Sequence, residues 1–468
     1  MCFLGGERQL KAGSTVTEEA RSGFTNRLAA MVAETPVGAF SDAALAAAAR
    51  AILNFVGTAI GGSTQPSQAI LSEAIGVGAE SGPSTVLGTR IRTNPLSASY
   101  LNAASANVLD FDDTHLPTVA HPIGPVASAL LALSQQRPTS GTVLLQSLIL
   151  GVEVACRLGR SLTPAHYARG WHITATTGVV GAAAGAARAM GLPLEHTSVA
   201  MAHAATQACG LVVSLGAMSK SLAVAGAARN GLLSAILAER GFTAPANAIE
   251  APFGFVDLFG ANASVDLPRR IDRPGWELES VQLKPYPCAV VINPLVECGR
   301  AVAEAVGSDE IATIAAHGPP LLLIRANRPN ISSRGEAQLS AQHALAATLL
   351  HGQPRLEDFG EAAISDLRLA DLRARIGLVA DLAHSIDSAR LAVTLHNGRV
   401  LEWEVGKNVA IGQRMLSPQD LEAKFVTLAV PVIGEERAAR IMSDIAGFGA
   451  AVDIGAVMEK WNFMEKWN

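Results

Sequence analysis

A fourteen-residue segment, LDFDDTHLPTVAHP (109–122), holds three aspartates and two histidines within a mostly apolar chain. If the helical pattern before this segment continues into it, Asp110 and Thr114 lie four residues apart on one helical face. Pro117 and the proline that ends the segment then force a loop, which can carry His121 back towards them. The sequence therefore predicts that a carboxylate, a hydroxyl and an imidazole converge.

A converging carboxylate and imidazole suit general acid–base catalysis. Two other interpretations of the segment stay open. One is a solvated, acid-rich turn with surface histidines, and the other is a metal site, because aspartate and histidine are metal ligands. No HExxH motif and no second histidine pair accompanies the segment. We therefore expect no metal and no other cofactor.

Three further stretches carry isolated ionisable residues. His172 in GWHITATTG precedes a helix of small residues, whose first backbone N–H groups could hold an anion. The alternative is a histidine that caps the helix or packs in the core. Lys220 stands among apolar neighbours in GAMSKSLAVAGAARNG, where a surface lysine is the ordinary interpretation. Lys284 in KPYPCAVVINP precedes a rigid Pro-Tyr-Pro turn, which could be no more than a hinge.

The composition is that of a large folded protein. Of 468 residues, 49% are hydrophobic and 16% charged, which excludes a disordered chain, and the length favours two domains. The net charge is −5 and no basic stripe is present, so we expect no nucleic-acid partner. Aromatic residues are only 4% while glycine and alanine abound, which predicts closely packed helices.

The sequence shows no recognisable targeting signal. The apolar stretches 141–159 and 173–192 are interrupted by charged residues, namely Glu153 and Arg157 in the first and Arg188 in the second. We therefore expect no membrane span. The first twenty residues lack the apolar core of a signal peptide. The five cysteines form no CxxC motif, which indicates reduced thiols in a cytoplasmic protein.

Helical patterns dominate up to about residue 265, and beyond that point short β-like patterns appear between the helical ones. SDAALAAAARAILNFVGTAIGG is typical, with Ser41 as the expected N-cap and Gly61–Gly62 as the stop. EIATIAAHGPPLLLI, in contrast, contains short β-like runs broken by Pro319–Pro320. ARLAVTLHNGRVLEWEV predicts a β-hairpin about Asn397–Gly398, because both turn positions need positive φ.

These patterns divide the chain into two domains. We expect residues 20–270 to form the first part of a helical domain, 271–404 a smaller α+β domain, and 405–457 a return to the helical domain. Residues 1–19 and 458–468 are expected to be flexible tails. The second tail contains MEKWN twice, which indicates a duplication and not a functional element.

The segments quoted above together resemble the MmgE/PrpD family, which includes 2-methylcitrate dehydratase, cis-aconitate decarboxylase and iminodisuccinate epimerase. The resemblance runs from about residue 25 to residue 448. It rests on LDFDDTH…HP, GWH…GAAAGAA, TQACGL…K…AARNGLLSAILAERGFTAP and KPYPC. It implies a mainly α fold, with a large all-helical domain assembled from both ends of the chain plus a smaller α+β lid domain.

The resemblance also implies a set of site residues. The catalytic group that it implies is Asp110, His121, His172, Lys220 and Lys284. The substrate-binding group that it implies is Thr114, with Tyr286 at the lid hinge and His343 in the lid segment SAQHALAA. Departures from the family pattern, such as Ser221, Val224 and Ala289 where many relatives carry basic or other polar residues, make the pocket less basic and more apolar.

The function that the resemblance implies is a cofactor-independent lyase. It would be a dehydratase or decarboxylase of a small di- or tricarboxylate, such as a 2-methylcitrate-like compound. An epimerase or isomerase of a small dicarboxylate, iminodisuccinate-like, is the main alternative. A non-catalytic carboxylate-binding protein and a metal-dependent hydrolase are weaker ones. We also expect a homodimer, because so apolar a chain would expose excess apolar surface as a monomer, and the resemblance implies the same.

Overall fold

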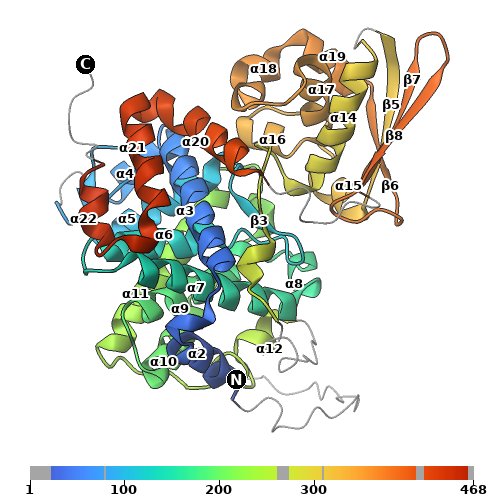
Figure 1. The fold of residues 1–468 in the computed structure, drawn as a ribbon. Helices are drawn as coiled ribbons and strands as arrows, with labels where there is room; N and C mark the ends of the chain where they lie inside the picture. The colour runs from blue at the N-terminus through green and yellow to red at the C-terminus, as the bar shows by residue number, and fades with distance from the viewer. Residues whose placement is uncertain (1–22, 78–80, 261–273, 308–309, 407–415, 462–468) are drawn as a thin grey trace, which may run out of the picture.

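The computed structural model describes residues 23–77, 81–260, 274–307, 310–406 and 416–461. Within them the chain forms a helical body and a smaller α+β domain at one end of it (Figure 1). This is the mainly α architecture that the sequence predicts.

The first part of the helical domain is a succession of helices joined by short turns. They are α2 (Phe24–Glu34), α3 (Asp42–Gly62), α4 (Pro66–Ala74), α5 (Pro95–Val108), α6 (Ile123–Ser134), α7 (Gly141–Leu162), α8 (Ala165–Ala168), α9 (Ile173–Ala189), α10 (Leu194–Thr206), α11 (Ser219–Glu239) and α12 (Phe255–Phe259). Two short pairs of strands accompany them, β1 (Ser84–Thr85) with β2 (Arg92–Thr93), and β3 (Asp113–His115) with β4 (Val281–Leu283). The 3-10 turns are η1 (Val37–Ala39), η2 (Val212–Ser214), η3 (Glu277–Ser280), η4 (Val290–Ile292), η6 (Leu356–Phe359) and η8 (Phe448–Ala450).

Local sequence explains where these helices begin and how closely they pack. The Ser41 hydroxyl accepts the Ala44 N–H at 3.1 Å, so the predicted cap of α3 is confirmed, and the helix ends at Gly62 as predicted. Helices α7 and α9 touch backbone to backbone, since a Cβ added to Gly181 would lie 2.6 Å from the Gly151 carbonyl oxygen. The prediction of closely packed helices from the small-residue content is therefore confirmed.

In the part of the chain that the structure describes, three helices, α3, α7 and α11, are long and apolar enough to cross a membrane by length and composition alone. In the structure α7 lies at the centre of the helical domain, and most of its apolar window is buried there. Two of its charged residues pair with each other in the core, Arg157 Nε lying 2.5 Å from Glu153 Oε1.

The C-terminal segment returns to the helical domain, as the sequence predicts. Its helices α20 (Pro418–Ile433), α21 (Glu435–Ala446) and α22 (Ile454–Glu459) complete the body, with α20 and α21 packed against α3 (Figure 1). The prediction that the tail begins at residue 458 is wrong, because Met458 and Trp461 are buried. Trp461 stacks on Phe448 and donates its indole N–H to Asp444 at 2.9 Å. The second copy of MEKWN lies outside the described residues, as does the predicted tail 1–19.

The smaller domain is built on a four-stranded sheet of order β6-β5-β7-β8, in which β5 and β6 are parallel and the other pairs antiparallel. Its strands are β5 (Ile311–Gly318), β6 (Ile376–Ala380), β7 (Ala389–Leu395) and β8 (Val400–Val405). Its helices are α14 (Asn293–Ala305), α15 (Pro320–Ala326), α16 (Arg334–Gln338), α17 (Ala341–His351), α18 (Glu361–Ser365) and α19 (Leu367–Ala374).

The β7–β8 hairpin about Asn397–Gly398 is confirmed, but only Gly398 of these two residues has a positive φ, which is 82°. The expectation of positive φ at both turn positions is therefore wrong. The expected strand after Pro319–Pro320 is wrong, because LLLI lies in helix α15, where Pro320 occupies the first turn. The domain also begins later than residue 271, since β4 still pairs with β3 of the helical domain.

Candidate active site

The turn after α5 departs from the helical continuation that the sequence predicts. Helix α5 ends at Val108, and Asp110 adopts a left-handed conformation with φ of 49°. Such a conformation is strained for a residue with a Cβ and is found most often at functional sites. Residues 113–115 then form β3, so Asp110 and Thr114 do not share a helical face. The expectation of a continuing helix is wrong, because the reversal at Asp110 sends the chain into strand pairing.

Strand pairing between β3 and β4 brings a distant lysine to this turn. Asp113 is paired with Leu283, and the Lys284 N–H donates to the Asp112 carbonyl at 3.0 Å. The Lys284 ammonium lies 3.0 Å from Asp110 Oδ1 and 3.1 Å from Asp112 Oδ1, and its side chain is 1% exposed. The KPYPC segment is therefore more than a hinge, because it delivers a buried cation to two carboxylates.

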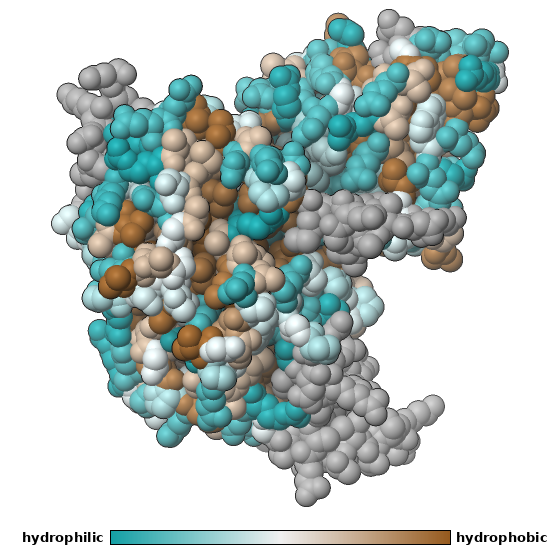
Figure 2. Space-filling model, in the orientation of Figure 1, coloured by the Kyte–Doolittle hydropathy of each residue, from teal (hydrophilic) through white to brown (hydrophobic). Residues whose placement is uncertain are grey.

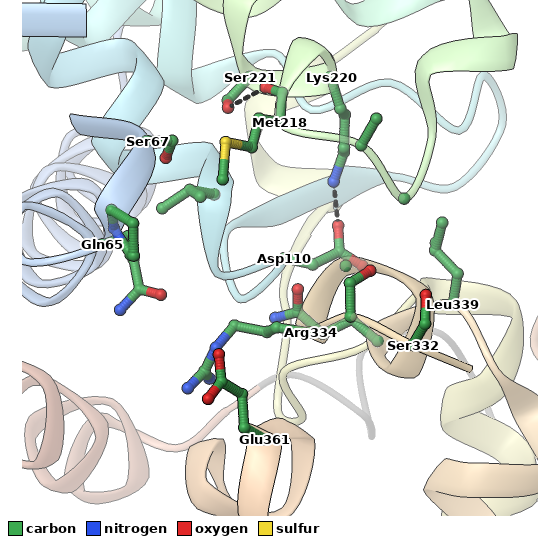
Figure 3. A pocket seen from close by; sticks show the side chains of 17 residues that line it. Gln65, Ser67, Asp110, Met218, Lys220, Ser221, Ser332, Arg334, Leu339 and Glu361 are labelled. Atoms are coloured by element: carbon green, nitrogen blue, oxygen red, sulfur yellow. Dashed lines mark hydrogen bonds and ion pairs between the residues drawn. The ribbon is translucent and has the colours of Figure 1, made fainter. Parts of the chain in front are cut away.

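A second lysine reaches the same carboxylate from the first turn of α11. Lys220 Nζ contacts Asp110 Oδ1 (Figure 3). Burial raises the pKa of Asp110, but the charges of Lys220 and Lys284 outweigh that effect and hold this pKa well below its ordinary value. Burial lowers the pKa of Lys284, but the charges of Asp110 and Asp112 raise it by more, so this pKa lies above its ordinary value. Asp110 is therefore a carboxylate held between two cations.

His121 returns to the cluster, as the predicted loop requires. Its Nδ1 contacts the Asp113 carbonyl oxygen and lies 3.3 Å from Thr114 Oγ1 and 3.7 Å from Asp112 Oδ1. A carbonyl oxygen can only accept, so Nδ1 carries the proton and Nε2 keeps its lone pair. Burial lowers the pKa of His121, although Asp112 raises it in part. Neutral His121 is therefore a suitable base.

The other histidine of the opening segment has a different place. His115 Nε2 lies 2.9 Å from Glu277 Oε2, and Arg160 Nε lies 2.6 Å from the second oxygen of that carboxylate. This buried group ties β3 to α7 and η3 at the base of the strand pair. His115 therefore stabilises the position of β3 through Glu277 and is not part of the acid–base cluster.

His172 is the residue directly before α9, as predicted, and its side chain makes no cap hydrogen bond. Its Nδ1 is buried, and no hydrogen-bond partner for it lies among the residues that the structure describes. Burial first, and then the charges of His121 and Lys220, lower the pKa of His172 to about 3. An unpaired, neutral imidazole in a buried site is costly unless a ligand uses it, which favours a functional role.

Three residues that the sequence did not single out hold the backbone segments that carry the cluster. The Lys424 ammonium of α20 donates to Asn54 Oδ1 at 2.7 Å, to the Phe111 carbonyl at 2.7 Å and to the Lys284 carbonyl at 2.8 Å. It also lies 4.0 Å from the centre of the Phe111 ring. Asn54 in turn donates to the Asp112 carbonyl at 3.2 Å. Lys424 thus connects the backbones that carry the two catalytic segments, and only its proximity in space could reveal this.

The cluster of charged residues around Asp110 opens into a small hollow of about 60 Å³ between the two domains. Asp110, His121, Lys220 and Lys284 line it from the helical side. From the lid side comes Arg325 of α15, another residue that sequence reasoning missed.

Arg325 is a cation with free hydrogen-bonding capacity. Its guanidinium carbon lies 4.6 Å from the ring centre of Tyr167, and its Nη2 donates to the Tyr167 carbonyl at 3.3 Å. Its Nε is buried and meets no acceptor within the described ranges. Because Arg325 lines the hollow, this arrangement leaves an N–H group for an incoming anion.

Two predicted substrate-binding residues lie apart from this cluster. The Tyr286 hydroxyl accepts a hydrogen bond from Arg300 at 3.3 Å, and its ring belongs to the core of the α+β domain. His343 is fully buried in α17, bonded to the Asp358 carbonyl at 2.7 Å and to Arg373 at 3.1 Å. Neither residue lines the hollow, whereas Thr114 does reach the cluster through His121.

The cluster also contains donor atoms of the kinds that bind metals. Among the described residues, ligand atoms of Asp110, Asp112 and His121 lie within 4.8 Å of one another. The Lys284 ammonium already stands beside both carboxylates, and a divalent cation there would be repelled by it and by Lys220. The donor set therefore suits an ammonium ion better than a metal.

Buried lysines, carboxylates and neutral imidazoles at the junction of a helical and an α+β domain suit acid–base chemistry on a small anion. The chain belongs to the MmgE/PrpD family. The MmgE/PrpD N-terminal domain matches residues 26–268, and the MmgE/PrpD C-terminal domain matches residues 286–446.

Curated relatives are decarboxylases. The chain is 27% identical to the cis-aconitate decarboxylase of Homo sapiens over 86% of this chain and 87% of the relative. It is 27% identical to the Mus musculus enzyme over 73% of each chain. It is 25% identical to the cis-aconitate decarboxylase of Aspergillus terreus over 81% of this chain and 84% of the relative. These similarities support a lyase of this family.

Proposed function

We propose that the protein is a cofactor-independent lyase that removes CO₂ from a small tricarboxylate, with cis-aconitate as the first substrate to test. The observation that carries this proposal is that Lys220, Lys284 and Arg325 line one hollow together with neutral His121. Neutral His172 does not line this hollow but is close enough to interact with His121 and Lys220. Such a group of residues can hold several carboxylates and still supply a base or an acid. The decarboxylase relatives support this choice of reaction.

In this proposal substrate binding changes the charge of the histidines. Without substrate, Asp110 and Asp112 balance the two lysines. A bound tricarboxylate adds negative charge, which raises the pKa of the neighbouring imidazoles and favours uptake of a proton. The proton that catalysis needs is then stored on His121 or His172, within the closed site.

The bond-breaking step then follows from elementary chemistry. When the C–C bond to a carboxylate breaks, CO₂ leaves without the bonding electron pair. That pair moves into the adjacent C=C system, where the lysines stabilise the developing negative charge. The carbon at the far end takes the stored proton from the imidazole, and the product carries one carboxylate fewer. The protein supplies position, charge and the proton.

An NMR experiment in D₂O with cis-aconitate and a panel of small di- and tricarboxylates tests this proposal. We expect loss of one carboxylate as CO₂ with one solvent deuteron in the product. Loss of water instead would identify a dehydratase, and deuterium exchange without net conversion an epimerase that uses the two histidines on opposite faces. Binding of the panel without any of these changes would contradict all enzymatic readings. His121→Ala is the matched control, since it removes one of the two imidazoles that can supply the proton and leaves both lysines.

A further inference from the structure

A second and much larger hollow adjoins the cluster on the other side of the Asp110–Lys220 pair. Its volume is about 520 Å³, and it shares Asp110, Lys220 and Leu339 with the small hollow described above. It lies between the start of α4, the end of α5, the turn before α11 and the α16 region of the lid (Figure 3). The shared residues place the two hollows next to each other across the Asp110–Lys220 pair.

The charged groups in the large hollow balance one another. Lys220 is paired with Asp110. At the opposite end Arg334 points towards Glu361 (Figure 3). Burial lowers the pKa of Arg334, although the charges of Glu357 and Glu361 raise it in part. Arg334 also donates to the Leu356 carbonyl at 3.0 Å. The hollow therefore presents no unbalanced cation to a second anionic group.

Most of its neutral polar groups already have partners within the protein. The Ser221 hydroxyl donates to the Met218 carbonyl at 3.0 Å, and the Ser332 hydroxyl donates to Glu336 at 2.8 Å. The Gln338 amide donates to the Leu109 carbonyl. These groups gain little from a polar ligand, because a new hydrogen bond would first have to replace an existing one.

The remaining wall is apolar and accessible. Pro66, Val108, Ala217, Met218 and Leu339 line it. Met218 is 58% exposed although it lies at the domain junction, so its thioether faces open space. An exposed methionine is a flexible apolar surface that adapts to a chain of variable shape. The walls thus favour hydrocarbon over charge.

We infer that this hollow receives an apolar substituent of the substrate, so that the preferred ligand is a small polycarboxylate carrying an unbranched alkyl chain of several carbons. The inference rests on the proposed function for the placement of the carboxylates beside Lys220, Lys284 and Arg325. The chain then leaves the reacting centre past the Asp110–Lys220 pair into the apolar space. A pocket of this size is typical of small-molecule sites lined mainly by apolar groups.

Calorimetric titration with succinate, methylsuccinate, butylsuccinate and octylsuccinate tests the inference without turnover. We expect the Kd to fall roughly two- to fourfold for each methylene that enters the hollow. Ala217→Phe fills the hollow from an exposed turn, and it should bind succinate and convert the parent substrate as the wild type does while losing the gain from chain length. Ser219→Phe is the matched control, because it adds the same ring two residues away, outside the lining.

A Kd that stays constant along the series in the wild type, or no binding at all, would overturn the inference. So would a chain-length gain that survives in both Ala217→Phe and Met218→Trp, the second variant being a check against misfolding of the first. The proposed function is scored separately, by conversion of cis-aconitate. If affinity rises with chain length but cis-aconitate is not converted, the apolar subsite is supported and the decarboxylase proposal is contradicted. If cis-aconitate is converted but affinity does not rise with chain length, the decarboxylase proposal is supported and the subsite is contradicted.

Discussion

Asp110 is the residue on which the charges of the site converge. Its left-handed backbone directs one carboxylate oxygen to both Lys220 and Lys284, while Oδ2 has no hydrogen-bond partner in the described part of the chain. The neutral imidazoles of His121 and His172 complete the group. At this scale the predictions separate residues that do chemistry from residues that pack.

The two buried histidines His172 and His343 should respond differently to replacement. His172→Ala should lower kcat by roughly 10²–10⁴ with a small change in melting temperature, because an acid–base group is lost. His343→Ala should cost about 0.5–3 kcal/mol of stability and leave kcat per folded molecule nearly intact, because its partners are Asp358 and Arg373 in the lid. Measurement of kcat and melting temperature on both variants checks this. Equal losses of kcat would contradict the division.

His172 should also make the folded state sensitive to acid. Its pKa is about 3 in the folded protein, whereas an unfolded histidine titrates at about 6.5. Between these values the unfolded chain binds a proton that the folded chain does not. The stabilisation is therefore complete above about pH 6.5 and is lost as the pH falls.

Urea unfolding at pH 7 and at pH 5 tests this dependence on His172. The wild type should lose about 2 kcal/mol more than His172→Gln between the two pH values. The comparison uses differences with pH, so a constant effect of the substitution cancels. The same loss in both proteins would show that His172 is not buried in its neutral form.

At the scale of elements, segments remote in sequence each deliver one cation. Helix α11 brings Lys220, the residue after β4 is Lys284, α15 of the lid brings Arg325, and α20 brings Lys424. The position of Lys284, for example, is held by the β3–β4 register, which local sequence does not encode. Single-residue changes in these elements should therefore have distinct kinetic signatures.

Arg325→Met should raise KM by roughly 10- to 100-fold, because charge-assisted hydrogen bonds to a substrate carboxylate are lost. The effect on kcat should be smaller, since Arg325 lines the hollow from the lid whereas His121 lines it from the helical domain. Arg355→Met, which removes an exposed arginine elsewhere in the lid, is the control and should leave KM unchanged. Steady-state kinetics on the wild type and the two variants test this prediction. An unchanged KM for Arg325→Met would exclude Arg325 from substrate binding.

Lys424→Met keeps the apolar stem but removes the ammonium that holds the Phe111 and Lys284 carbonyls. We expect a stability loss of about 1–3 kcal/mol from the unpaired acceptors. We also expect a clear fall in kcat per folded molecule as Lys284 shifts. Lys460→Met removes an exposed lysine of the same C-terminal segment and should change neither quantity. Normal kcat in a folded but destabilised Lys424→Met protein would restrict this lysine to a structural role.

At the scale of the whole molecule, each domain has a large hydrophobic core of its own. The helical body also keeps apolar residues on its surface. Figure 2 shows them in a band over the helical domain. Between α10 and α11 the exposed apolar side chains include Leu211 and Val213, the latter 86% exposed. Surfaces of this kind favour association.

We therefore predict that the protein is a homodimer. Light scattering at micromolar concentration should give about twice the chain mass of 48.4 kDa. Val213→Asp places a charge on the exposed segment and should weaken association if this segment lies at the interface. A monomeric mass for the wild type would refute the prediction, and a dimeric Val213→Asp protein would move the interface to another face.

Sequence alone determined the helical body, the caps and stops of helices such as α3, and the β7–β8 hairpin. These features depend on interactions over a few residues, which periodicity, capping and turn chemistry express directly.

Tertiary structure decided the reversal at Asp110, the burial of both lysines, the recruitment of Arg325 and Lys424, and the enclosure of Tyr286 and His343 in the lid. Local propensity favoured a helix through residue 114, but pairing of β3 with β4 overrode it. A lone lysine in an apolar stretch looks like a surface residue until the carboxylate that neutralises it is known. That partner lies more than a hundred residues away for Lys220, and only packing brings the two together.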